Sequence, residues 1–75
     1  MLHRKLYIVV YVILFMSKQT ITNKILSYSI EIVDIALNNM TGNNNYEYLE
    51  DFLSDWSLDD LNKLLEECKE VYYNG

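Results

Sequence analysis

The chain opens with a continuous apolar run, and apolar side chains recur at helical spacing along much of the remainder. The run at residues 6–16, LYIVVYVILFM, contains no charged side chain. As a helix it would be about 17 Å long and apolar on every side. A strand is also favoured, because five of the eleven residues are Val or Ile, but no second strong strand follows to pair with it. We therefore predict an ordered apolar element near residues 5–16, a helix or a single strand, packed on the rest of the chain.

Residues 20–39 show the clearest helical periodicity. At about 100° per residue, the polar side chains of Glu31, Asp34 and Asn38 fall on one narrow arc, and apolar side chains occupy most of the remainder. A strand-like alternation over residues 26–32 competes with this pattern but does not continue through Asp34 and Asn38. We therefore expect one helix over residues 20–39, and its wide apolar arc predicts packing on two sides.

The C-terminal half predicts two further helices separated by polar turns. The sequence TGNNN at residues 41–45 is typical of a loop. Apolar side chains at i, i+3, i+4 and i+7 then predict a helix over residues 46–55. Ser57 begins the sequence SLDD, which resembles a capping box and predicts a last helix over residues 58–72. The expected core consists of Ile25, Tyr28, Ile32, Leu49, Phe52, Leu53, Trp56, Leu61, Leu65 and Cys68.

Together these elements predict one mainly α domain over residues 1–75, a small three- to four-helix bundle. Its two parts are the apolar N-terminal element at residues 1–16 and an acidic helical bundle at residues 17–75. A chain of 75 residues buries only about 60% of its unfolded surface, so its core is thin. Such a chain often relies on a partner, and a homo-oligomer is one form that this support could take.

Charge is distributed unevenly along the chain. Residues 1–24 carry four basic side chains and no acidic one. Residues 46–75 carry nine acidic side chains and two lysines, a net charge of −7. Such a charge repels nucleic acid and favours a basic protein surface. We therefore expect another protein as the partner and no direct binding of nucleic acid.

Catalytic and cofactor sites are not expected. His3 and Cys68 are the only histidine and the only cysteine, so the chain can form neither an intrachain disulfide nor a cysteine-based zinc site. One N-terminal histidine provides no Ser–His–acid set, and two glycines, Gly42 and Gly75, cannot form a phosphate-binding loop. We expect a protein without enzymatic activity, metal or cofactor. The single cysteine makes a reducing cytoplasm the simpler location.

Acidic and aromatic side chains are the candidate partner-binding residues. Glu47, Asp51 and Asp55 would form a stripe at i, i+4 and i+8, with carboxylates about 6 Å apart along the helix axis. Such rows can imitate the phosphate backbone of a nucleic acid, and tyrosines supply contacts typical of interface hot spots. The remaining candidates are Asp59, Glu66 and Glu70 of a second, interrupted stripe and the tyrosines Tyr46, Tyr48, Tyr72 and Tyr73.

These features predict a small acidic protein that binds another protein and blocks or modulates it. In size, composition and charge the chain resembles small acidic helical proteins of phages and mobile elements. The resemblance implies a stoichiometric inhibitor of a host enzyme. The rows of carboxylates add the prediction that this enzyme acts on nucleic acid and is blocked by charge mimicry. The alternative is a small protein held at a membrane by residues 6–16, which have basic side chains on both flanks. A signal sequence or a translation start at Met16 would also account for the apolar run.

Overall fold

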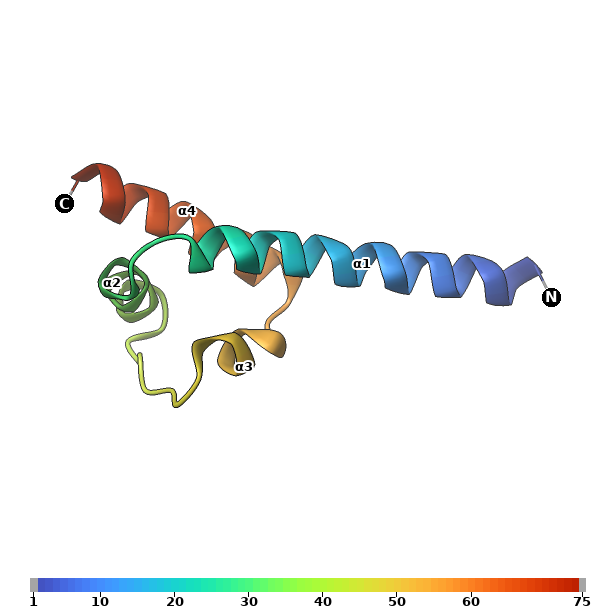
Figure 1. Cartoon of the computed structure of the whole chain (residues 1–75), viewed down its shortest axis with the longest axis horizontal. Coiled ribbons are helices and arrows are strands. Elements are labelled where there is room, and N and C mark those ends of the chain that lie inside the picture. The colour runs from blue at the N-terminus through green and yellow to red at the C-terminus, as the bar shows by residue number, and fades with distance from the viewer. Residues whose placement is uncertain (1, 75) are drawn as a thin grey trace.

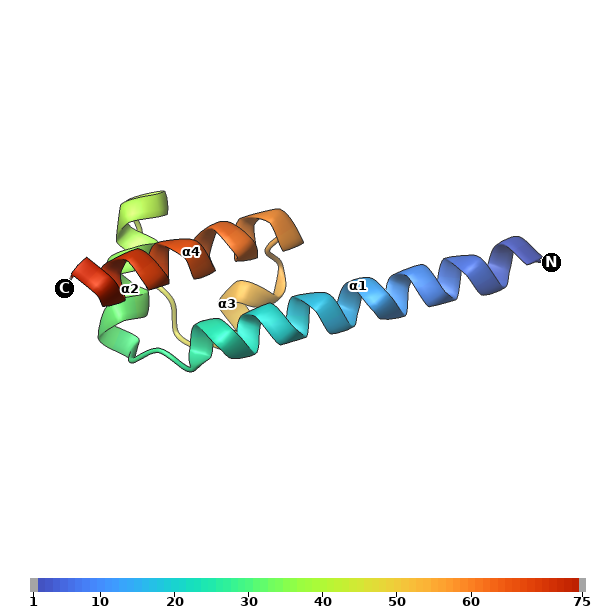
Figure 2. The same ribbon diagram turned by 90° about the horizontal axis from the view of Figure 1, so that it is seen from above.

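Four helices make up the fold. The structure, a computed structural model, describes the backbone of residues 2–74 and the side chains of residues 12–74. This range contains no strand, so the mainly α prediction is confirmed. The helices are α1 (Leu2–Leu26), α2 (Ile30–Thr41), α3 (Leu49–Ser54) and α4 (Leu58–Asn74). The C-terminal half of α1 lies beside α4, whereas its N-terminal half projects away from the other helices (Figures 1 and 2).

The single helix expected over residues 20–39 is wrong, because the chain is interrupted after α1 and restarts as α2. The Ser27 hydroxyl donates to the carbonyl oxygen of Lys24, which also accepts from the Ser27 N–H at 3.3 Å. Ser29 has extended dihedral angles, and its hydroxyl accepts a hydrogen bond from the N–H of Ile32, as a helix N-cap does. Serine hydroxyls compete with the helical backbone in this way. The apolar periodicity spans the interruption and therefore does not reveal it.

α3 is shorter than the helix expected over residues 46–55. Tyr48 precedes it in an extended conformation without a side-chain cap, and Asp55 ends it as the C-cap. Because only six residues are helical, the expected stripe does not form on one helix. Asp51 lies within α3, whereas Glu47 lies before it and Asp55 after it.

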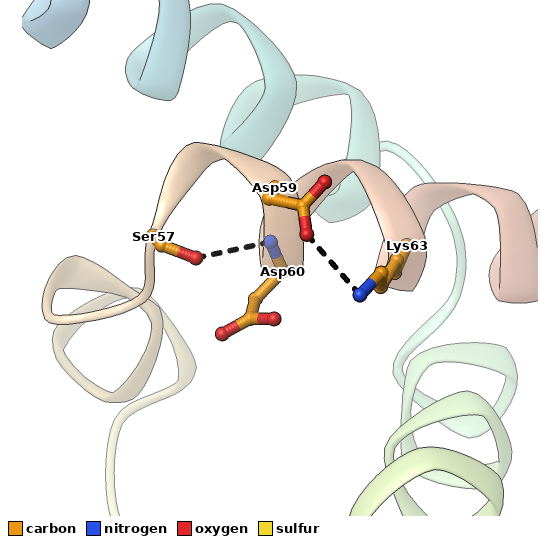
Figure 3. Close-up of polar contacts among 4 residues, drawn as sticks. All are labelled: Ser57, Asp59, Asp60 and Lys63. Carbon is orange, nitrogen blue, oxygen red and sulfur yellow. Dashed lines mark hydrogen bonds and ion pairs between the residues drawn. The ribbon is translucent and has the colours of Figure 1, made fainter.

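α4 begins as its sequence predicts. The Ser57 hydroxyl accepts a hydrogen bond from the Asp60 N–H at 3.1 Å, and the Asp59 carboxylate pairs with the Lys63 ammonium at 3.1 Å (Figure 3). The two aspartates in the first turn also complement the positive end of the helix dipole. The helix continues to Asn74, slightly beyond its expected end.

The core lies where α4 packs against α1 and α2. Five of the ten expected core residues are buried: Ile25, Leu53, Leu61, Leu65 and Cys68. The other five are partly buried and pack against them: Tyr28, Ile32, Leu49, Phe52 and Trp56. The core cluster contains four further buried hydrophobic residues: Val33, Ala36 and Leu37 of α2 and Leu64 of α4. α2 crosses the direction of α1 and is seen nearly end-on in Figure 1, so its buried face does not continue that of α1.

The apolar N-terminal element is a helix rather than a strand, and it forms one unit with the rest of α1. α1 packs on the bundle through its C-terminal half, where Ile25 is buried completely. Val12–Met16 are instead 39–67% exposed, which differs from the packing expected for the whole element, and the side chains of residues 5–11 lie outside the described set. α4 has 17 residues and is about 26 Å long, too short to cover α1, which has 25 residues and is about 38 Å long. Within the described residues, no helix is both long and apolar enough to cross a membrane.

Gly42 ends α2 in a left-handed conformation, with φ of 70°, and its N–H bonds to the Asn38 carbonyl at 2.9 Å. A Cβ at this position would meet no atom within 4 Å, so any penalty for a side chain comes from the backbone conformation alone. We expect Gly42→Ala to lower the free energy of unfolding by about 1 kcal/mol. Gly42→Asn should cost less, because asparagine tolerates this conformation. Urea denaturation of the three proteins measures the difference, and equal losses for both variants would contradict the explanation.

Candidate partner-binding surface

A groove between the start of α2 and the start of α3 brings acidic and apolar side chains together. We call it the α2–α3 groove; it is lined by Ile30, Tyr46, Glu47, Tyr48, Leu49, Glu50 and Asp51. Its lining includes three carboxylates and no basic side chain. Ile30 and Tyr48, two of the apolar side chains in it, are 53% and 65% exposed. The groove therefore combines negative charge with apolar surface that is accessible to a partner.

Tyr46 attaches the chain before α3 to α2. Its hydroxyl donates a short hydrogen bond to a carboxylate oxygen of Asp34, and its ring centroid lies 5.6 Å from that of Phe52. Burial, followed by the hydrogen bond to Asp34 and the negative charge of Asp34, raises the pKa of Tyr46 to about 12. The hydroxyl therefore stays protonated at neutral pH and keeps donating. The sequence predicts Tyr46 as a partner contact. In the structure its hydroxyl is instead bonded to Asp34, and its ring packs beside Phe52 and lines the groove.

The groove gathers four of the predicted partner-binding residues: Tyr46, Glu47, Tyr48 and Asp51. Sequence reasoning missed its other members, Ile30, Leu49 and Glu50, as contacts. Glu50 had a visible signal, since it is an acidic residue beside Asp51. Ile30 had none, because sixteen residues separate it from Tyr46 and only the tertiary fold brings the two together.

The acidic side chains of α4 are largely engaged with neighbours. Asp59 pairs with Lys63, and Glu66 pairs with Lys69 at 3.1 Å. The pKa of the Lys63 ammonium is raised, first by its hydrogen bond to Asp59. Exposed pairs of this kind contribute little to stability, but each lysine offsets the charge of its partner. Two of the three members of the second, interrupted stripe therefore lie beside a lysine, so the stripe is part of a mixed-charge face.

The remaining predicted residues lie elsewhere. Asp55 lines a separate depression with Trp56 and Asp60. Tyr72 and Tyr73 lie near the end of α4, where the Tyr72 ring is edge-on to Tyr28 at 5.8 Å and to Tyr73 at 5.5 Å. Neither tyrosine lines the α2–α3 groove. The ten predicted residues thus form no single site, and the groove is the largest group that the fold assembles from them.

Val12–Met16 of α1 form a second exposed surface. Five consecutive apolar side chains are 39–67% exposed here. Two of them, Ile13 and Met16, line a shallow depression with residues of the next turns of α1, among them Lys24. We call residues 12–16 the exposed apolar segment. The sequence predicts an element that is apolar on every side, and the structure shows that these five side chains remain substantially exposed, with Phe15 also lining a pocket beside Leu53 and Leu61.

Reactive groups are few among the described side chains. No three His, Cys, Asp or Glu residues in this part of the chain lie close enough to hold a metal ion. Burial raises the pKa of the Cys68 thiol to about 11, with a smaller effect from Glu67, so the thiol is protonated and inaccessible at neutral pH. The fold thus defines a small all-α domain with two surfaces that a partner could contact, the α2–α3 groove and the exposed apolar segment.

No protein family model, no curated protein and no solved structure matches this chain.

Proposed function

We propose that this is a small non-catalytic protein that binds a basic segment of another protein in the α2–α3 groove and thereby blocks or modulates that protein. The observation that carries the proposal is the groove itself, whose lining combines three carboxylates with exposed Ile30 and Tyr48. A protein surface that is acidic and partly apolar at one place complements a lysine or arginine beside an apolar residue.

The chemistry of such a contact divides between the two kinds of side chain. The aliphatic stem of a lysine or arginine can lie on Tyr48 and Ile30 while its charged head meets Glu47 or Asp51. Exposed ion pairs contribute only about 0–1 kcal/mol each, so the apolar contact supplies most of the affinity. The carboxylates mainly accelerate encounter and select a basic partner.

Charge mimicry of a nucleic acid is a narrower version of this proposal, and the geometry gives it less support. It relies on regular rows of carboxylates. Glu47 and Asp55 lie outside α3, and Asp59 and Glu66 are each paired with a lysine. An enzyme that binds nucleic acid is still a suitable partner, because its basic surface would offer segments that fit the groove.

Affinity capture from cell lysate with two charge-reversal variants tests the groove. Glu47→Lys with Asp51→Lys changes the groove, and Asp55→Lys with Glu70→Lys makes the same change of net charge elsewhere. We expect a partner that is recovered with the wild type and with the second variant, and is reduced about tenfold or more with the groove variant. Identification of bound proteins by mass spectrometry at low and high salt provides the measurement. Equal recovery with all three proteins, or loss with the second variant alone, would place the contact outside the groove.

A further inference from the structure

We propose that the exposed apolar segment binds an anionic lipid bilayer and holds the acidic bundle at the membrane surface. This surface is separate from the α2–α3 groove and does not depend on the function proposed for it. The inference rests on three observations: the direction in which the apolar side chains face, the position of the segment relative to the bundle, and the distribution of charge along the chain.

The exposed apolar segment faces every direction around the axis of α1. Val12–Met16 are five consecutive helical residues, each 39–67% exposed, and five positions at about 100° apart pass through a full turn. A groove on another protein, or one helix of a second copy, would cover only one side of such a helix. Lipid surrounds a helix on all sides, so it is the occupant that an all-round apolar helix suits best outside a protein core.

The segment also lies at the edge of the bundle, which it meets where Phe15 lines a pocket with Leu53 of α3 and Leu61 of α4. Figures 1 and 2 show, from two directions, that the N-terminal half of α1 extends beyond the other helices. The sequence remains uncharged and almost wholly apolar from Met16 back to Leu6. A bilayer can therefore receive this part of α1 without disturbing the packing of Ile25 and the rest of the core.

Only the N-terminal part of the chain, residues 1–30, has a positive charge that complements an anionic membrane. Residues 1–30 contain four lysines and arginines and no acidic residue, and the first acidic side chain is Glu31. The basic side chains stand on both flanks of the apolar run, with Lys5 before it and Lys18 after it. This placement suits a short apolar helix that enters one leaflet of the bilayer, with its apolar side chains among the acyl chains and the flanking basic side chains reaching the headgroups. The acidic bundle would be repelled from the same surface and kept in water.

Vesicle sedimentation with the full-length protein tests the role of the apolar side chains. Ile13 is 58% exposed in the segment, and Ile35 is 50% exposed on α2, so replacing either with aspartate is a matched change. We expect the wild type and Ile35→Asp to sediment with vesicles of phosphatidylcholine and phosphatidylglycerol. Ile13→Asp should bind at least about tenfold more weakly, because a carboxylate is costly within the acyl region. Circular dichroism of each variant confirms that the bundle is folded.

The role of charge has its own matched pair. Lys18→Gln with Lys24→Gln removes two positive charges from α1, whereas Lys63→Gln with Lys69→Gln removes two from α4. The first pair should weaken binding to the anionic vesicles roughly fivefold per lysine, equivalent to about 1 kcal/mol each, and the second should change it little. Vesicles of phosphatidylcholine alone should bind the wild type less than the anionic vesicles do.

Two results would overturn the proposal. Wild-type protein that stays in the supernatant with both kinds of vesicle excludes lipid as the occupant. Equal binding by wild type and Ile13→Asp shows that the segment is not the contact. Sedimentation velocity without lipid then distinguishes the other occupant, because an oligomer that Ile13→Asp dissociates would assign the segment to a second copy of the chain.

Discussion

Replacing Leu37 with alanine is expected to lower the free energy of unfolding by about 2–5 kcal/mol. Leu37 is completely buried in the core cluster, on α2, which packs against α4. Alanine would remove the branched end of the side chain and its contacts from a region with no solvent to fill the space. A domain of 75 residues has an unfolding free energy of about 4–11 kcal/mol, so this one change could remove a large share of it.

Ile35→Ala is the control for this prediction. Ile35 lies two residues earlier on the same helix and is 50% exposed, so its truncation should change stability by no more than about 0.5 kcal/mol. Urea denaturation followed both by circular dichroism and by the fluorescence of Trp56 gives the two values and tests whether unfolding is two-state. If Ile35→Ala proved as destabilising as Leu37→Ala, α2 would bury a different face from the one described.

Local signals in the sequence were sufficient for α4 and insufficient for α2. The serine at residue 57 and the aspartates after it mark the start of α4, and the structure forms the expected cap. The interruption at Ser27–Ser29 is equally local, but continuous apolar periodicity concealed it, and a helix over residues 20–39 was predicted instead. The interruption lets α2 cross α1 and bury a different face. The expected core therefore omits Val33, Ala36 and Leu37, which this face buries.

The sequence predicts several of the residues that line the α2–α3 groove, but not the tertiary arrangement that brings them together. The acidic and aromatic residues at 46–51 are evident in the sequence, and four of them were candidate contacts. The sequence predicts that residues 46–48 are helical, whereas in the structure they precede α3. The hydrogen bond between Tyr46 and Asp34 and the position of Ile30 depend on the packing of α2 against the rest of the chain. No periodicity within one segment contains that information.

Replacing Tyr46 with phenylalanine is expected to lower the free energy of unfolding by about 1.5 kcal/mol and to loosen one wall of the groove. The change removes the hydroxyl that donates to Asp34 but keeps the ring beside Phe52. Hydrogen bonds to a charged group contribute about 1.5–3 kcal/mol, and the lower value applies here because water can reach this half-buried site. Partner capture should weaken as well, since residues 47 and 48 follow directly on Tyr46.

The pH dependence of stability separates the hydroxyl of Tyr46 from other effects. Its pKa is about 12 in the folded protein, against the ordinary tyrosine value of 10.0 that applies to an unfolded chain, so folding favours the protonated form. This contribution is fully present below about pH 10 and is lost as the pH rises toward 12. Ionisation of Cys68, whose pKa is raised from 9.0 to about 11, lowers the stability of both proteins by the same amount between about pH 9 and 11. This effect therefore cancels in the difference between them. The difference in free energy of unfolding between wild type and Tyr46→Phe, measured by urea denaturation, should therefore narrow between about pH 10 and 12. A constant difference over this range would show that folding does not raise the pKa of the Tyr46 hydroxyl.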